Sequence, residues 1–76
     1  MVRAKFTCTQ KVEKTFGPED EKGYDIHLYV VSGGSEEDQK FFKYTPYGEI
    51  TLGVLNPAAA AQFEEGKDYY VDFKEA

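Results

Sequence analysis

The chain has 76 residues, with nine Lys and Arg, fourteen Asp and Glu, one Cys and one His. This length allows a single small domain, which we expect to span residues 1–76. One cysteine excludes an internal disulfide framework, one Cys with one His excludes a closed Cys/His zinc site, and the net charge of −5 disfavours non-specific binding to phosphates.

Residues 2–16 alternate between apolar and polar side chains, which predicts a long strand with one buried face. Gln10 and Lys14 interrupt the apolar set, so we expect a bulge or bend near them. The predicted inward residues are Val2, Ala4, Phe6, Cys8, Val12 and Phe16. A cysteine in such surroundings is expected to be structural and unreactive.

A polar turn at residues 17–23 leads to a second predicted strand at residues 24–31. His27 has the outward parity of this strand, which is typical of a surface histidine. Tyr29 and Val31 share that parity, and because they are apolar another element of the fold could bury their side chains. Residues 32–38 then predict a flexible acidic loop.

Residues 39–45 predict a third strand and residues 49–55 a fourth. Between them, Thr45-Pro46-Tyr47-Gly48 has the residues of a tight turn, with Pro at its second position and Gly at its fourth. The two strands therefore read as a hairpin.

Asn56 followed by Pro57 is a helix start signal, because Asn caps free N–H groups and Pro is tolerated in the first turn. We expect a two-turn helix over residues 58–63 that ends at Gly66. A last strand follows at residues 68–74, with Tyr69, Val71 and Phe73 inward. Five strands with one short helix before the last predict a small β-barrel, either SH3-like or OB-like.

No catalytic site emerges from the sequence. A nucleophile needs a base and an orienting group nearby, and neither Cys8 nor His27 has such partners along the chain. The acidic runs at residues 19–21 and 36–38 lack the spacing of a calcium loop. We therefore expect no enzyme activity, no metal, no cofactor and no small-molecule substrate.

Charge is distributed unevenly, with +3 on residues 1–16 and −8 on the remainder. A basic groove with interleaved aromatic rings can hold a single-stranded nucleic acid. The residues that would form such a groove here are Lys5, Lys11, Lys40, Lys43 and Phe41. A further alternative is an acidic inhibitor that mimics nucleic acid through its two acidic loops.

Four aromatic residues have an outward parity or lie in a turn: Tyr29, Phe41, Tyr47 and Tyr70. Exposed aromatic side chains are typical of protein interfaces. They indicate contact with a protein partner or self-association, and this is the function that the sequence favours.

The segments Phe41–Ile50 (FFKYTPYGEI), Asn56-Pro57 and Phe63–Phe73 (FEEGKDYYVDF) resemble a set of short proteins encoded by tailed bacteriophages, mostly of unassigned function. The opening Val2-Arg3-Ala4-Lys5-Phe6 resembles theirs as well. The resemblance implies a phage accessory protein, made in the bacterial host cytoplasm and present either there or in the virion. No stretch approaches 18 apolar residues, so we expect no membrane association through a spanning helix.

Overall fold

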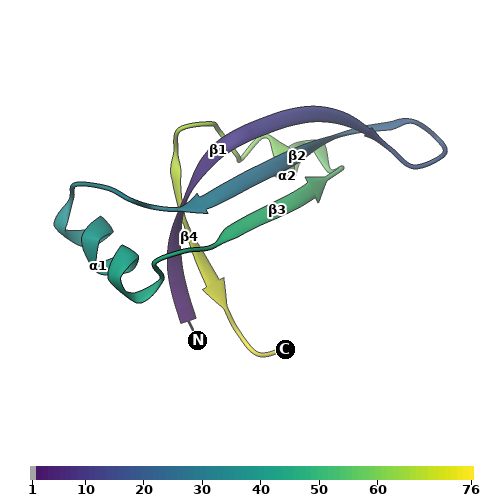
Figure 1. The fold of residues 1–76 in the computed structure, drawn as a ribbon. Coiled ribbons are helices and arrows are strands. Elements are labelled where there is room, and N and C mark those ends of the chain that lie inside the picture. Colours follow the sequence, from purple (N-terminus) through teal and green to yellow (C-terminus); the bar gives the residue numbers. More distant parts are fainter. Residues whose placement is uncertain (1) are drawn as a thin grey trace.

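The computed structural model describes residues 2–76. Four strands form one antiparallel sheet in the order β3-β2-β1-β4, with two short helices in the connections (Figure 1). The elements in chain order are β1 (Val2–Phe16), β2 (Glu21–Val30), α1 (Glu36–Tyr44), β3 (Glu49–Val54), α2 (Pro57–Ala60) and β4 (Asp68–Phe73). In the described part of the chain, neither helix is long and apolar enough to cross a membrane.

Strands β1 and β2 form a long arched hairpin that extends beyond the rest of the sheet (Figure 1). Its turn contains Gly17 at φ 71° and Asp20 at φ 51°, in the left-handed region that Gly and Asp tolerate best. The predicted first strand is confirmed, and the second begins earlier than expected, at Glu21 rather than Tyr24.

A β-bulge in β1 decides which side chains are buried. The register shifts between Cys8 and Gln10, close to the predicted interruption. An extra residue moves every later side chain to the opposite face. Val12, predicted to be inward, is therefore 40% exposed, whereas Lys11 lies opposite the buried Ile26.

The core lies on one face of the sheet, which we call the inner face. Its cluster of buried residues comes from β1 and β2: Ala4, Phe6, Cys8, Ile26 and Leu28. Cys8 is completely buried, as predicted, and Val31, the residue after β2, is also buried. Tyr69, Val71 and Phe73 lie opposite Phe6, Ala4 and Val2, which confirms the inward parity predicted for the last strand.

The prediction of a third strand at residues 39–45 is wrong, because this segment is helix α1. Ser35 caps the helix by accepting a hydrogen bond from the Asp38 amide, 3.0 Å away. Three acidic residues in the first turn and Lys43 in the last turn match the helix dipole. The acidic run at residues 36–38 therefore belongs to a helix, and no hairpin joins this segment to β3.

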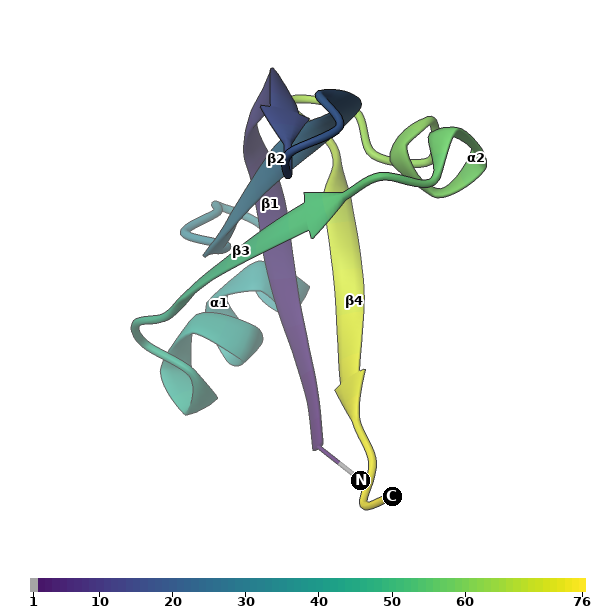
Figure 2. The same cartoon turned by 90° about the vertical axis from the view of Figure 1, so that its right-hand side faces the viewer.

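The five-stranded barrel is also wrong, because the sheet has four strands and stays open between β3 and β4. Figure 2 shows β3 crossing in front of β1 and diverging from β4 toward the bottom of the view. The Cα radius of gyration is 14.0 Å, whereas a compact chain of this length has about 11 Å. The molecule is thus an extended half-barrel with a thin core.

The start of the helix before the last strand is confirmed. The Asn56 carboxamide oxygen accepts hydrogen bonds from the Ala58 and Ala59 amides at 2.9 and 3.4 Å, and Pro57 occupies the first turn. Helix α2 ends at Ala60, earlier than predicted. Gly66, at φ 86°, belongs instead to the turn that Lys67 closes by donating to the Glu64 carbonyl.

Candidate functional site

The open side of the half-barrel contains an apolar groove with a cavity of about 470 Å³. Inner-face side chains of three strands and one ring from the segment after α2 form its walls. The apolar lining residues are Leu28, Ile50, Leu52, Phe63, Tyr69, Val71 and Phe73. The groove exists because every second side chain of a strand points to this face, and within residues 2–76 no fifth strand covers these side chains.

The segment after α2 fixes one end of the groove. The Phe63 and Tyr69 rings pack with their centroids 5.4 Å apart. The Tyr69 hydroxyl donates to the Gln62 carbonyl at 2.9 Å and accepts from the Glu64 amide at 2.8 Å. These contacts hold the aromatic wall in place, so the groove is preformed at this end.

Lys11 holds the same segment from β1. Its ammonium group donates to the carbonyls of Ala60 at 2.8 Å and Phe63 at 3.1 Å, and lies 4.8 Å from the centre of the Tyr24 ring. The last carbonyls of a helix lack donors within it, and Lys11 supplies a donor to the carbonyl of Ala60, the last residue of α2. Only the bulge in β1 brings this lysine to the inner face.

The four aromatic residues of the predicted protein contact fall into two separate groups. Tyr29 and Tyr47 line a shallow cavity of about 530 Å³ with Pro46 and Glu49. Tyr47 is 85% exposed and Tyr29 is 45% exposed. A hydrogen bond to the Glu49 carboxylate raises the pKa of Tyr29. This pair lies where the chain enters β3, in a cavity separate from the groove.

Phe41 and Tyr70 form the other group, in which α1 meets the outer face of the sheet. Their ring centroids are 5.9 Å apart. The Tyr70 hydroxyl donates to Glu37, and the Lys5 ammonium donates to Asp38 at 2.6 Å. These hydrogen bonds raise the pKa of Tyr70 and Lys5, and they lower the pKa of Glu37 and Asp38. This group attaches α1 to the sheet, and α1 has no buried residue of its own.

The cations predicted to bind nucleic acid do not line one groove. Lys5 lies on the outer face in contact with Glu37 and Asp38, and Lys11 lies on the inner face under α2. The alternation of residues 2–16 predicts an outward position for both lysines, and this prediction is wrong for Lys11. Lys40 and Lys43 are exposed on α1.

Cys8 and His27 have the positions that their parities predict. Burial raises the pKa of the Cys8 thiol, which keeps it protonated and poorly nucleophilic. The His27 ring lies on the outer face with Nδ1 3.4 Å from the Thr51 hydroxyl of β3. In residues 2–76 no three His, Cys, Asp or Glu side chains gather as metal ligands.

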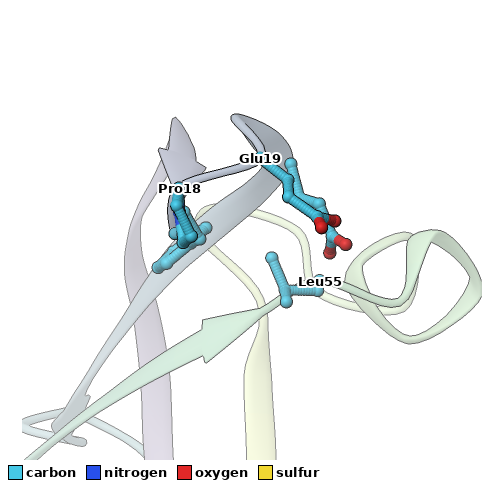
Figure 3. A pocket seen from close by; sticks show the side chains of 6 residues that line it. Pro18, Glu19 and Leu55 are labelled. Atoms are coloured by element: carbon cyan, nitrogen blue, oxygen red, sulfur yellow. The ribbon is translucent and has the colours of Figure 1, made fainter.

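A smaller cavity of about 240 Å³ lies at the tip of the hairpin. Leu55, the residue after β3, points toward Pro18 and Glu19 of the turn (Figure 3). Phe16 and Gly17 complete its apolar side. This contact braces the arch of the hairpin against the end of β3.

The sequence did not reveal the groove, although three of its lining residues, Tyr69, Val71 and Phe73, were predicted to be inward. A closed barrel would have buried them, and only the number of strands leaves them accessible. No family model, no curated protein and no solved structure matches the chain.

Proposed function

We propose that the protein is a non-enzymatic binding module that docks on another protein through its apolar groove. The observation that carries this proposal is the groove itself, which opens between two strands with no neighbour on their outer sides in residues 2–76. Apolar surface in such a position favours a partner that covers it. The sequence resemblance to short phage proteins supports an accessory role in an infected bacterium, in the virion or on a host factor.

The surface of the molecule supports the same conclusion. The accessible surface is 5705 Å², about 1,000 Å² above the roughly 4,700 Å² typical of a compact monomer of this mass. Each partner of a standard protein interface buries about 800 Å². Among the large apolar residues that remain exposed, Leu52 and Phe73 lie at the groove.

A matched pair of substitutions tests the groove. Leu52 is 38% exposed on the inner face, and Val12 is 40% exposed on the outer face. Peptides selected from a random display library on the wild-type protein should lose at least about tenfold in affinity for L52D, because a carboxylate in the groove opposes apolar docking. They should bind V12D as they bind the wild type.

The readout is titration of fluorescently labelled peptides, with circular dichroism as the check that both variants fold. Selection of no peptide, or of peptides that bind L52D and wild type equally, would contradict the proposal. A weaker effect of L52D than of V12D would move the binding site to the outer face.

The geometry does not favour the nucleic-acid alternative, because Lys5 and Lys11 are engaged within the protein. We therefore expect that adding the protein to labelled single-stranded oligonucleotides does not raise their fluorescence anisotropy, even at low salt. Binding that weakens steeply with salt and is lost in K40A/K43A would instead support that alternative.

A further inference from the structure

We propose that the partner in the groove is a second copy of this chain, paired antiparallel through the outer edges of two β3 strands. The inference rests on the proposed function, since it names the occupant of the same open side. Two β3 edges would join two four-stranded sheets into one continuous sheet.

The outer edge of β3 lacks the features that keep natural edges apart. Edge strands are commonly protected by charges, prolines or bulges. Residues 50–63 carry no charge in a chain that is 30% charged, and within β3 only Glu49 is ionisable. The other edge strand, β4, carries Asp68 and Asp72 on its outer face. The edge of β3 is therefore the more prone of the two to pair with another strand.

The backbone of β3 directs alternate residues to that edge. The Val30 amide donates to the Gly48 carbonyl at 3.3 Å, so Gly48 faces β2. Antiparallel strands alternate the direction of their backbone groups at each residue. The N–H and C=O groups of Glu49, Thr51 and Gly53 therefore point away from β2, and in residues 2–76 no other backbone segment accepts or supplies these bonds.

Symmetry then selects the register. A twofold axis perpendicular to the sheet keeps both inner faces on one side, and directly opposite residues must share a face. The axis thus lies midway between the two copies of one residue, and Thr51 is the central residue with outward-directed backbone groups. This register pairs Thr51 with Thr51 and Glu49 with Gly53 of the second copy, which gives about six backbone hydrogen bonds.

The same register suits the side chains. On the inner face, Ile50 of one copy lies opposite Leu52 of the other, so each groove gains an apolar neighbour. On the outer face, the two Thr51 side chains meet, which is a favourable cross-strand pair. The two Glu49 carboxylates are four residues apart along the strands, roughly 13 Å, which exceeds the screening length at physiological salt.

Two substitutions at Thr51 test the pairing. T51P removes an N–H that the monomer does not use, and T51K places two like charges opposite each other at the axis. We expect sedimentation equilibrium of the wild type to give a mass rising with concentration toward twice the 8.6 kDa of one chain. Both variants should raise the dimer dissociation constant at least about tenfold while keeping the wild-type circular dichroism.

Two control variants separate pairing from other effects of these changes. T51V keeps the backbone donor and, like T51K, loses the hydroxyl contact to His27, so it should dimerise as the wild type does. S32K adds the same charge at an exposed site outside β3 and should also dimerise.

A wild type that stays monomeric at millimolar concentration would overturn the inference, and so would dimerisation unaffected by T51P and T51K. Assemblies that grow beyond the dimer would overturn it in favour of head-to-tail pairing of β3 with β4. If the wild type is monomeric and still binds peptides whose affinity falls in L52D, self-pairing is refuted and the proposed function remains intact.

Discussion

Lys11 is the residue whose role differs most from its place in the sequence pattern. It reads as a surface lysine on an alternating strand, yet its ammonium group donates to the carbonyls of Ala60, at the end of α2, and Phe63, and lies over the Tyr24 ring. Its long apolar stem crosses the inner face while its charge supplies hydrogen bonds. It therefore couples the groove wall to β1.

Replacing Lys11 with Met keeps the stem and removes both hydrogen bonds, so we expect a loss of about 1–2 kcal/mol in the free energy of unfolding. Lys14 provides the control, because it lies on the same strand, is 58% exposed and pairs with Asp25 at 3.1 Å. K14M should cost at most about 1 kcal/mol. Urea unfolding measures both, and equal losses would remove the special role of Lys11.

Helix α1 is the element that depends most on polar contacts. None of its residues is buried, and it meets the sheet through Lys5, Glu37, Asp38 and the Phe41–Tyr70 ring pair. The hydrogen bond from Lys5 holds the pKa of Asp38 below its ordinary value. The attachment of α1 to the sheet should therefore depend on the negative charge of the Asp38 carboxylate.

A carboxyl group with a lowered native pKa binds protons more weakly when folded than when unfolded. It contributes stability above its unfolded pKa, and that contribution is lost as the pH falls through the native pKa. We expect D38N to lower the melting temperature at neutral pH and to match the wild type at a pH well below about 3.9, the ordinary value for Asp.

E36Q is the control for the pH experiment, because Glu36 is the exposed neighbour in the same helical turn and forms no ion pair in the structure of residues 2–76. Thermal unfolding from neutral to acidic pH gives the comparison. A D38N deficit that persists unchanged in acid, or one no larger than that of E36Q, would show that the contact with Lys5 does not hold the helix.

In the molecule as a whole, the buried core is small relative to the accessible surface. Its largest completely buried side chain is Ile26, which packs between β1 and β3 at the centre of the inner face. Truncating Ile26 leaves a cavity at the centre of a four-stranded open sheet. The dimer proposed above would add to stability by mass action.

We expect I26A to lower the free energy of unfolding by about 2–5 kcal/mol, a large share of the roughly 4–11 kcal/mol typical of a chain this long.

We also expect the wild-type melting temperature to rise with protein concentration, because dimerisation favours the folded state. Differential scanning calorimetry over a concentration series measures both. A melting temperature independent of concentration would speak against folding coupled to association.

The amino-acid sequence by itself determined the long first strand, the inward position of Cys8, the Asn56 cap and the inward face of the last strand. These features depend on local alternation and on capping chemistry, which neighbouring residues specify. The helix at residues 36–44 was also encoded locally, by Ser35 and the three acids after it. The aromatic residues Phe41, Phe42 and Tyr44 concealed it, because aromatic residues also favour strands.

Only the tertiary structure decided the rest. A single extra residue after Cys8 reversed the faces of Lys11 and Val12, and no alternation pattern shows on its own where a strand gains a residue. Closure depends on how many strands pair, so replacing one predicted strand by a helix left the half-barrel open. The groove and the free edge of β3 follow from that missing strand, because long-range pairing alone decides whether an apolar face is covered.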